Sequence, residues 1–477
     1  FLRVAEGQTL ALIGGDLNLT NATLYAPAGR IDLAAVGSAG EVMPTETDLV
    51  MQGFGKLGVL TIKHPSANRV MVDLGKPLGE IPLADVDASG AGGGAIFIRG
   101  GQWISQGGWV FANTYGSQAG RGLDVALTGA ARLEGRTGLS AATYSTGDAG
   151  SITLDAGRLE LGGNSQLSTS TFSAGHGGNL TLTVSDAMIL TDDSHLYATA
   201  QPQSTGDAGS ITLDVGRLDL SGGSQISSGT FGLGDGGNLT LAARDTVSIS
   251  GSDSTGLYPS GLFANVQPGA AGAAGSITLD VNRLELRDGG LISSTTWGAG
   301  RGGNITLTAH DTVIISGSDP ADRYPSGLYT QVQPGATGDA GSITLDVGRI
   351  ELSEGGLISS ATLGAGNGGN ITLVVRDTLT ISGISPTGRY PSSLFAGAYE
   401  GSTGNAGSIT LDVGRLELSE GGLIASATLG TGRGGNITLT ARDAVTIRGI
   451  SPMGRYSGLY ASAEPGSTGE ARTAASL

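Results

Sequence analysis

Hydrophobic and polar residues alternate in short segments that return at regular distances along the chain. One segment reads Ser-Ile-Thr-Leu and the other Asn-Ile-Thr-Leu or Asn-Leu-Thr-Leu, so the apolar residues are two positions apart. Residues two apart on a strand point to the same side, and each segment therefore predicts a strand with one buried side. The two kinds alternate at 151–154, 179–182, 210–213, 238–241, 276–279, 304–307, 342–345, 370–373, 408–411 and 436–439.

A glycine precedes most of these segments and marks the repeat length. From Gly94 and Gly122 onward the spacing between successive glycines is mostly 28, with one spacing of 31 and three of 38. Two further alternating stretches follow in each repeat, as in 218–220 and 225–227. A fixed period with one buried side per strand indicates a solenoid, in which each repeat buries its apolar side against its neighbours.

We therefore predict an all-β fold, a parallel β-helix with three strands per coil and a period of about 28 residues. The crossover rule for parallel strands predicts that it is right-handed. Residues 94–477 would form about twelve coils. Alternate coils carry a loop insert between the second and third strands, at 252–259, 318–325 and 384–391, with a related insert at 450–456. Coils are about 4.8 Å apart, so successive inserts should lie about 10 Å apart along one edge.

The inserts supply the candidate partner-binding residues. Three contain an arginine followed by a tyrosine, and the first has Leu-Tyr in the same place. Arginine and aromatic side chains are frequent anchors of binding surfaces. The candidates are Tyr258, Arg323, Tyr324, Arg389, Tyr390, Arg455 and Tyr456. A second interpretation stays open, in which the tyrosines and prolines pack each insert back onto its coil.

Large apolar residues recur at one further position, at a constant distance after the opening glycine of every second repeat. They are Phe172, Phe231, Trp297, Leu363 and Leu429. We expect them to form an internal stack at a corner of the coil. Trp103 falls in register with Leu159, an inward position, and is expected in the core.

Composition narrows the classes of partner. The 85 glycines and 14% charged residues would suggest a disordered chain if the repeat did not override them. The net charge of −16 argues against a nucleic-acid partner. The absence of cysteine excludes disulfides and thiolate metal sites. No apolar run is long enough to predict a transmembrane helix.

An enzyme on such a scaffold would need acids or bases that break the repeat, because a catalytic site is made once. Most acids instead recur with the repeat. Asp155, three residues before Arg158, is one of five such pairs, and we expect them to be exposed charge pairs or turn caps. The one non-repeating polar cluster, 192–195, is interpreted as a turn. We predict no catalytic residue, metal site or cofactor, and leave calcium binding at 234–238 and 300–304 open.

The N-terminal motifs resemble a known family. Leu2-Arg3-Val4, Gly7-Gln8-Thr9-Leu10 and Ala26-Pro27-Ala28-Gly29-Arg30-Ile31-Asp32-Leu33 are similar to the closing part of the haemagglutination-type secretion domain. That domain heads filamentous-haemagglutinin-like exoproteins of two-partner secretion, and the downstream repeats look like their cyanobacterial members. The resemblance implies a β-helical secretion-domain part at 1–93 and a repeat β-helix at 94–477. The family's Asn-Pro-Asn-type motif is missing, so a processed product or fragment is expected.

The resemblance implies a secreted or cell-surface structural rod for adhesion, aggregation or extracellular matrix. An outer-membrane two-partner secretion transporter would export it, and its partners would be cell-surface glycans or further copies of the chain. The alternative is an extracellular filament or sheath subunit that stacks end to end as a homopolymer. Because Arg472 replaces the expected glycine, we expect the last coil to be uncovered, which would suit such stacking. A polysaccharide-active enzyme is a distant third.

Overall fold

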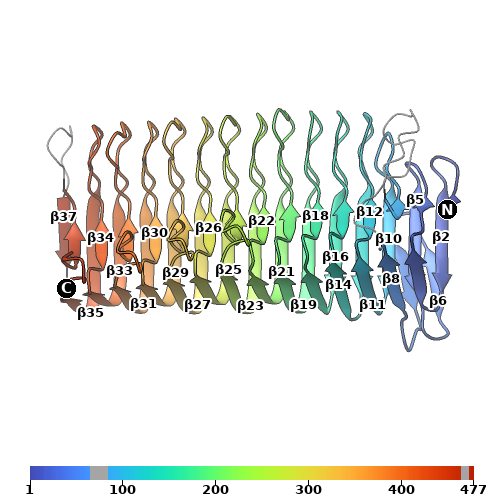
Figure 1. Cartoon of the computed structure of the whole chain (residues 1–477), viewed down its shortest axis with the longest axis horizontal. Helices are drawn as coiled ribbons and strands as arrows, with labels where there is room; N and C mark the ends of the chain where they lie inside the picture. Colours follow the sequence, from blue (N-terminus) through green and yellow to red (C-terminus); the bar gives the residue numbers. More distant parts are fainter. Residues whose placement is uncertain (65–83, 463–471, 477) are drawn as a thin grey trace. The chain divides into compact units, whose positions relative to one another are not determined.

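The computed structural model describes residues 1–64, 84–462 and 472–476, in which strands and turns occur but no helix. The chain divides into two compact units, Phe1–Gly216 and Arg217–Leu477. Within each unit the strands pair in parallel with their equivalents in the next coil (Figure 1). This confirms the predicted all-β parallel β-helix. The domain boundary at 93/94 stays a prediction.

The described part of the first unit contains the following complete strands. They are β1 (Leu2–Arg3), β2 (Thr9–Gly14), β3 (Leu17–Thr20), β4 (Leu24–Tyr25), β5 (Arg30–Ala35), β6 (Glu41–Pro44), β7 (Leu49–Gln52), β8 (Val59–Lys63), β9 (Val86–Asp87), β10 (Ala95–Gly100), β11 (Gln102–Gln106), β12 (Trp109–Phe111), β13 (Gly122–Leu127), β14 (Ala130–Glu134), β15 (Gly138–Ser140), β16 (Ser151–Ala156), β17 (Arg158–Leu161), β18 (Gln166–Ser168), β19 (Leu180–Leu190) and β20 (His195–Tyr197). Strands β6 and β7 pair antiparallel and form a hairpin.

Strand β21 (Ile211–Leu220) includes residues of both units. The second unit continues with β22 (Gln225–Ser227), β23 (Leu239–Ser250), β24 (Gly261–Phe263), β25 (Ile277–Arg287), β26 (Leu291–Ser293), β27 (Ile305–Ser316), β28 (Gly327–Tyr329), β29 (Ile343–Ser353), β30 (Leu357–Ser359), β31 (Ile371–Ser382), β32 (Ser393–Phe395), β33 (Ile409–Ser419), β34 (Leu423–Ala425), β35 (Asn436–Ile447), β36 (Gly458–Tyr460) and β37 (Arg472–Ser476).

The three predicted segments of a coil are separate strands in β16, β17 and β18, but from β19 onward the first two join into one long strand. A bulge marks the join. Val281 pairs with Ala309 and Arg283 with Thr312, so one residue on β25 lies opposite two on β27. Such a bulge bends a strand without ending it, and it replaces the turn expected at this corner.

The repeat length follows the prediction, with one shift of register. Ile277 pairs with Ile305 across a plain coil, and Leu239 pairs with Ile277 across a coil that carries an insert. Gly122, however, pairs with Ser151 rather than aligning with Gly150. Gly122 has φ +98° and a Cβ there would meet the Ser151 backbone, so glycine is required one position later than predicted.

The core consists of the inward apolar residues of each strand. On β25 the side chains of Ile277, Leu279 and Val281 are buried, whereas Thr278 and Asp280 between them are exposed. Burying one such aliphatic side chain contributes about 1.5–3 kcal/mol. Trp103 is fully buried, in register with Ala131, as predicted.

The predicted internal stack of large apolar residues is wrong, because three of its members are exposed. Phe172, Phe231 and Leu429 are 42%, 37% and 51% exposed. The residue before each of them is a buried threonine whose backbone forms a β-bridge to a neighbouring coil. The threonine hydroxyl bonds within its own turn; that of Thr230, for example, donates to the Gly234 carbonyl at 2.6 Å. A threonine satisfied in this way occupies the inward position, and alternation then turns the following residue outward.

The chain also continues its ladder near the C-terminus. Strand β37 pairs in parallel with β35, with Asn436 opposite Arg472. The expectation that the last coil is uncovered was therefore wrong for its first strand. Parallel pairing uses backbone groups, which every non-proline residue provides whatever its side chain.

Candidate functional site

The four inserts lie between the long and short strands of alternate coils in the second unit. An antiparallel bridge closes each at its root. The bridges join Ser252 to Pro259, Ser318 to Pro325, Ile384 to Pro391 and Ile450 to Tyr456. We name these segments inserts 1 to 4, and the surface that they form together the insert ridge. Their conformation decides which candidate residues a partner could reach.

Each insert is held by a polar side chain near its start. In insert 1 the Asp253 Oδ1 accepts hydrogen bonds from the N–H groups of Leu257 and Tyr258, both at 2.9 Å. Asp319 accepts from Tyr324 N–H in the same way at 2.6 Å in insert 2. Serines take over this role in inserts 3 and 4, where Ser385 Oγ accepts from Tyr390 N–H at 3.1 Å. This pattern is an Asx- or ST-type turn.

The hydrogen bonds of Asp253 also change its ionisation. Burial would raise the pKa of this carboxyl, but hydrogen bonds from Thr255, Tyr258 and Leu257 outweigh burial and lower the pKa to about 2. The carboxylate is the better acceptor, so these bonds favour the charged form. Insert 1 therefore carries a fixed negative charge near neutral pH.

Neighbouring inserts bind each other through side chains. The Tyr324 hydroxyl donates to the Leu257 carbonyl at 3.0 Å, and the Tyr390 hydroxyl donates to the Arg323 carbonyl at 3.3 Å. Asp322, 4% exposed, accepts from Ser385 Oγ at 2.9 Å. It also accepts from the hydroxyl of Thr387. Inserts 1, 2 and 3 thus form one connected ridge, and Tyr324 and Tyr390 pack onto the preceding insert.

The two terminal inserts expose the most apolar surface. Tyr258 is 59% and Tyr456 68% exposed, and Leu257 and Met453 beside them are exposed as well. Tyr456 stands at the bridge position that Pro391 takes in insert 3, because insert 4 is one residue shorter. Arg455 consequently takes the structural position of Tyr390. Aligning the two inserts by their Arg-Tyr motif would miss this shift of one residue.

The three arginines of the ridge are exposed and contact their surroundings differently. Arg323 Nε lies 3.7 Å from Asp319 Oδ2, and its guanidinium end lies against Gly256 of insert 1. The Arg389 guanidinium lies over the Tyr390 ring, with 5.1 Å between Cζ and the ring centroid. The seven candidate residues are thus brought together on one surface, where Leu257 and Met453 are exposed beside them. Sequence reasoning missed Met453, and it missed the buried Asp322 that joins inserts 2 and 3.

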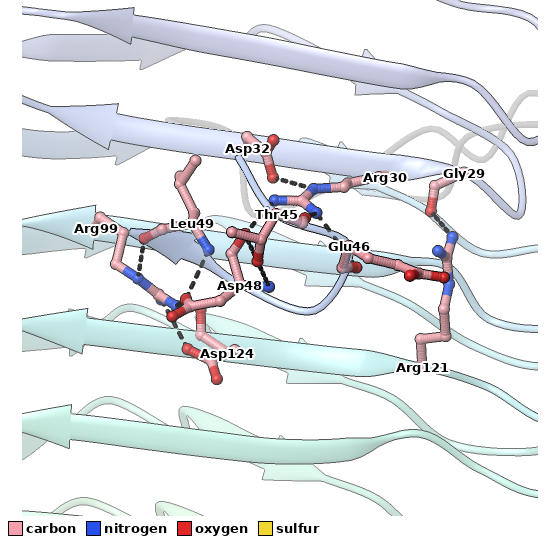
Figure 2. Close-up of polar contacts among 10 residues, drawn as sticks. All are labelled: Gly29, Arg30, Asp32, Thr45, Glu46, Asp48, Leu49, Arg99, Arg121 and Asp124. Carbon is pink, nitrogen blue, oxygen red and sulfur yellow. Dashed lines mark hydrogen bonds and ion pairs between the residues drawn. The ribbon is translucent and has the colours of Figure 1, made fainter. Parts of the chain in front are cut away.

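A second polar cluster, in the first unit, holds the β6–β7 hairpin against the sheet (Figure 2). Arg30 Nε donates to Asp32 Oδ1 at 2.7 Å, and its Nη2 to the Asp48 carbonyl at 2.8 Å. Arg99 Nη2 lies 2.6 Å from Asp48 Oδ1, and its Nη1 2.7 Å from Asp124 Oδ1. Burial would raise the pKa of Asp48, but Arg99 and the Leu49 N–H lower it.

Apolar contacts complete the attachment of the hairpin. The guanidinium groups of Arg30 and Arg99 both lie over the Phe97 ring, with their Cζ atoms 4.3 and 5.5 Å from its centroid. Leu49 of the hairpin packs with Phe97, Ala34 and Ala95. Sequence reasoning missed this cluster. A signal for this cluster is nevertheless present in the sequence. The outward positions of the equivalent strands in most later coils include serine or threonine, whereas those of β5 and β10 include arginine and phenylalanine.

A groove of about 860 Å³ lies beside the hairpin. Its lining includes Phe54, Leu57, Gln102 and Leu127 together with several glycines. Of its described lining residues, Asp155 is the one carboxylate. Acid–base cleavage of a glycosidic bond normally uses two, and the groove supplies no such pair.

The predicted pairing of Asp155 with Arg158 is wrong. Arg158 Nε instead lies 2.6 Å from Glu160 Oε1, and its Nη1 3.5 Å from Asp186 Oδ2 in the next coil. Residues two apart on a strand share a side, whereas residues three apart do not. The charges are mostly on the outer face, as expected.

The non-repeating cluster at 192–195 is a polar turn in the structure. Asp192 and Asp193 have φ of 54° and 59°, and His195 Nε2 lies 3.1 Å from Asp193 Oδ1. Burial lowers the pKa of His195 against the opposing effect of Asp193. Across the residues that the structure describes, no group of three or more histidine, aspartate or glutamate side chains could hold a metal ion.

Comparison with known protein families, curated proteins and solved structures gave no match for this chain. The likeness to filamentous-haemagglutinin-like exoproteins therefore stays a prediction from its motifs. Within the described ranges, no helix has the length and apolar character needed to cross a membrane.

Proposed function

We propose that the protein is a secreted or cell-surface structural rod for adhesion, aggregation or matrix formation, and that the insert ridge is its contact surface. The observation that carries this proposal is the ridge itself. Four inserts present a tyrosine each, and three of them an arginine beside it, at steps of two coils. A surface that repeats the same chemistry suits multivalent contact, in which several weak contacts add up.

The construction of the inserts supports a binding role. The plain coils close without an insert, so the inserts are additions to a complete coil. Each addition nevertheless has its own root bridge and its own polar cap. Loops held by a rigid scaffold are the usual place for binding residues.

The partners proposed are cell-surface glycans or further copies of the chain. Arginine and tyrosine anchor many binding surfaces, and both are exposed on the ridge. Export through an outer-membrane two-partner secretion transporter, and an extracellular location, are proposed on the resemblance of residues 1–42 and of the repeats to the family. We propose no catalytic activity.

The test is a variant with Arg389→Ala, Arg455→Ala and Tyr456→Ala, which changes exposed side chains of the ridge. We expect its binding to whole cells, measured with labelled protein, to fall at least about tenfold, as loss of interface anchors does. A matched control, Arg301→Ala with Arg433→Ala, changes two exposed arginines outside the inserts. Equal binding by the ridge variant and the wild type would refute the proposal.

The alternative, end-to-end stacking into a filament, makes a different prediction in the same experiment. The ridge variant would then form filaments as the wild type does, visible by electron microscopy. Cell binding that depends on filament formation, and not on the ridge, would favour this alternative.

A further inference from the structure

The insert ridge has opposite charges at its two ends. Inserts 1 and 2 contain three carboxylates, of Asp253, Asp319 and Asp322, and one guanidinium, of Arg323. Inserts 3 and 4 contain two guanidiniums, of Arg389 and Arg455, and no carboxylate. The first half of the ridge therefore has a formal charge of −2 and the second half +2. Asp253 is partly exposed, whereas Asp319 and Asp322 are buried just beneath the surface.

Exposed apolar side chains add to this pattern. Leu257 and Tyr258 are exposed on insert 1, and Met453 and Tyr456 on insert 4. Both ends of the ridge thus offer one aliphatic and one aromatic side chain beside a charged group. The middle inserts are more polar at the surface, with Arg323, Thr387 and Arg389 exposed.

We infer that the insert ridge pairs with the insert ridge of a second copy of the chain that lies antiparallel to it. In that arrangement insert 1 faces insert 4 of the other copy, and insert 2 faces insert 3. Asp253 then meets Arg455, and Leu257 and Tyr258 meet Met453 and Tyr456. The same contacts occur twice, as in any two-fold interface. The inference rests on the proposed function and names its partner.

The geometry of the ridge supports this arrangement. Inserts recur every two coils in both copies, so their spacing of about 10 Å matches along the whole ridge. The contacts between Tyr324 and Leu257 and between Asp322 and Ser385 hold inserts 1 to 3 in place. A surface fixed in advance loses little conformational entropy on binding.

Other acidic residues lie near the ridge but at its base. Asp288, Glu354 and Glu420 occupy the turns of the coils between the inserts and are exposed. Asp288 lies beside Gly317, directly before the root of insert 2. An anionic polymer along the ridge would meet these carboxylates and the negative first half, whereas a second copy lying antiparallel brings the guanidinium groups of its Arg389 and Arg455 to that half.

The ridge is one insert wide, so we expect a weak pair. Interfaces below about 1,200 Å² are typically transient. Antiparallel pairing joins chains that project from opposite surfaces, and many such pairs between two cells would act together. Because opposite charges contribute, added salt should weaken the pair; charges are screened over about 10 Å at 0.1 M ionic strength.

A charge-swap experiment on the full chain tests the inference. The first protein carries Arg389→Glu and Arg455→Glu, so both halves of its ridge are negative. The second carries Ser254→Lys and Ala321→Lys, at exposed positions of inserts 1 and 2 that leave the caps Asp253 and Asp319 intact. Association is measured by sedimentation velocity at low salt, and folding of each protein by its thermal transition.

We expect the wild type to self-associate, each variant alone to do so at least about tenfold more weakly, and the mixture of both variants to recover association. Dimers of the first protein at wild-type strength would overturn the inference. So would a mixture that stays monomeric, because antiparallel pairing then sets the unaltered negative half of the first protein against the unaltered positive half of the second, while the altered half of the first protein no longer faces a negative half, as it does in the first protein alone. The control Arg301→Glu with Arg433→Glu should associate as the wild type does.

The experiment separates the inference from the proposed function. A wild type that stays monomeric up to about 1 mM, where pairing would contribute only about 4 kcal/mol, overturns the inference. If the ridge variants still lose cell binding in that case, the proposed function stands and the partner is a glycan or another cell-surface molecule. If they keep it, both are wrong.

Discussion

At the scale of single residues, alternation along the strands explains most side chains, and the exceptions lie at turns. The strand rule placed Trp103 in the core, where it is fully buried. It failed at Phe172, because the buried position there belongs to Thr171, whose backbone bridges to the next coil. The sequence pattern does not mark a threonine as an inward residue, because a buried hydroxyl needs a hydrogen-bond partner. That partner is provided by the folded turn, which the pattern does not show.

Replacing Trp103 with alanine tests the core assignment. We expect the free energy of unfolding to fall by about 3–5 kcal/mol, the usual cost of removing a large buried aromatic. Chemical denaturation followed by circular dichroism measures it. Gln102→Ala changes the exposed neighbour on the same strand and should cost less than about 0.5 kcal/mol. Similar losses for the two variants would contradict the buried position.

The low pKa of Asp253 predicts how insert 1 responds to acid. The folded-state pKa, about 2, lies below the ordinary value of 3.8. The stabilisation is therefore complete above pH 3.8 and is lost as the pH falls towards 2. Hydrogen exchange of the Leu257 and Tyr258 amides should stay slow at pH 4 and accelerate near pH 2. In Asp253→Asn we expect fast exchange already at pH 4, and slow exchange there would contradict the account.

At the scale of elements, the β6–β7 hairpin depends on a few charged contacts. Arg99 bonds the Leu49 carbonyl at 3.0 Å and the Asp48 carboxylate at 2.6 Å, and one of its faces lies against Phe97. Removing the buried Arg99 guanidinium takes a donor from the Leu49 carbonyl and the ion-pair partner from the half-exposed Asp48 carboxylate. The hairpin should therefore loosen while the strands beneath it stay paired.

Arg99→Ala tests this dependence. Amides of Val42 to Val50 should exchange at least about tenfold faster, which corresponds to about 1.4 kcal/mol, while β13 amides change little. Arg132→Ala, an exposed arginine of the same unit, is the control. Unchanged protection of the hairpin would contradict the dependence on Arg99 and leave Arg30 and the apolar packing on Phe97 as what holds it.

The elements also show how much of the site could be predicted from sequence. The repeat located all four inserts, because insertions stand out against a fixed period. It could not show that the Tyr324 hydroxyl reaches the Leu257 carbonyl, a contact 67 residues away. Nor could it show that Tyr456 takes the place of Pro391, because the Arg-Tyr motif is the same in both inserts while their lengths differ by one residue.

At the scale of the whole molecule, the coils form a self-sufficient scaffold, and the inserts are the proposed binding surface added to it. The coils bury their apolar side chains against neighbouring coils and need no insert to do so. The inserts contribute few buried apolar residues. They do carry exposed arginines and tyrosines that share one surface, namely Arg323, Arg389, Arg455, Tyr258 and Tyr456. Stability and binding should therefore be separable by changing different residues.

The measurement that tests this claim most directly uses a chain in which all four inserts are replaced by the Ser-Glu-Gly-Gly turn found at 353–356. Its thermal transition and its binding to cells are compared with those of the wild type. The account predicts a transition within a few degrees of the wild type and loss of cell binding. A folded variant that binds cells as well as the wild type does would contradict the account.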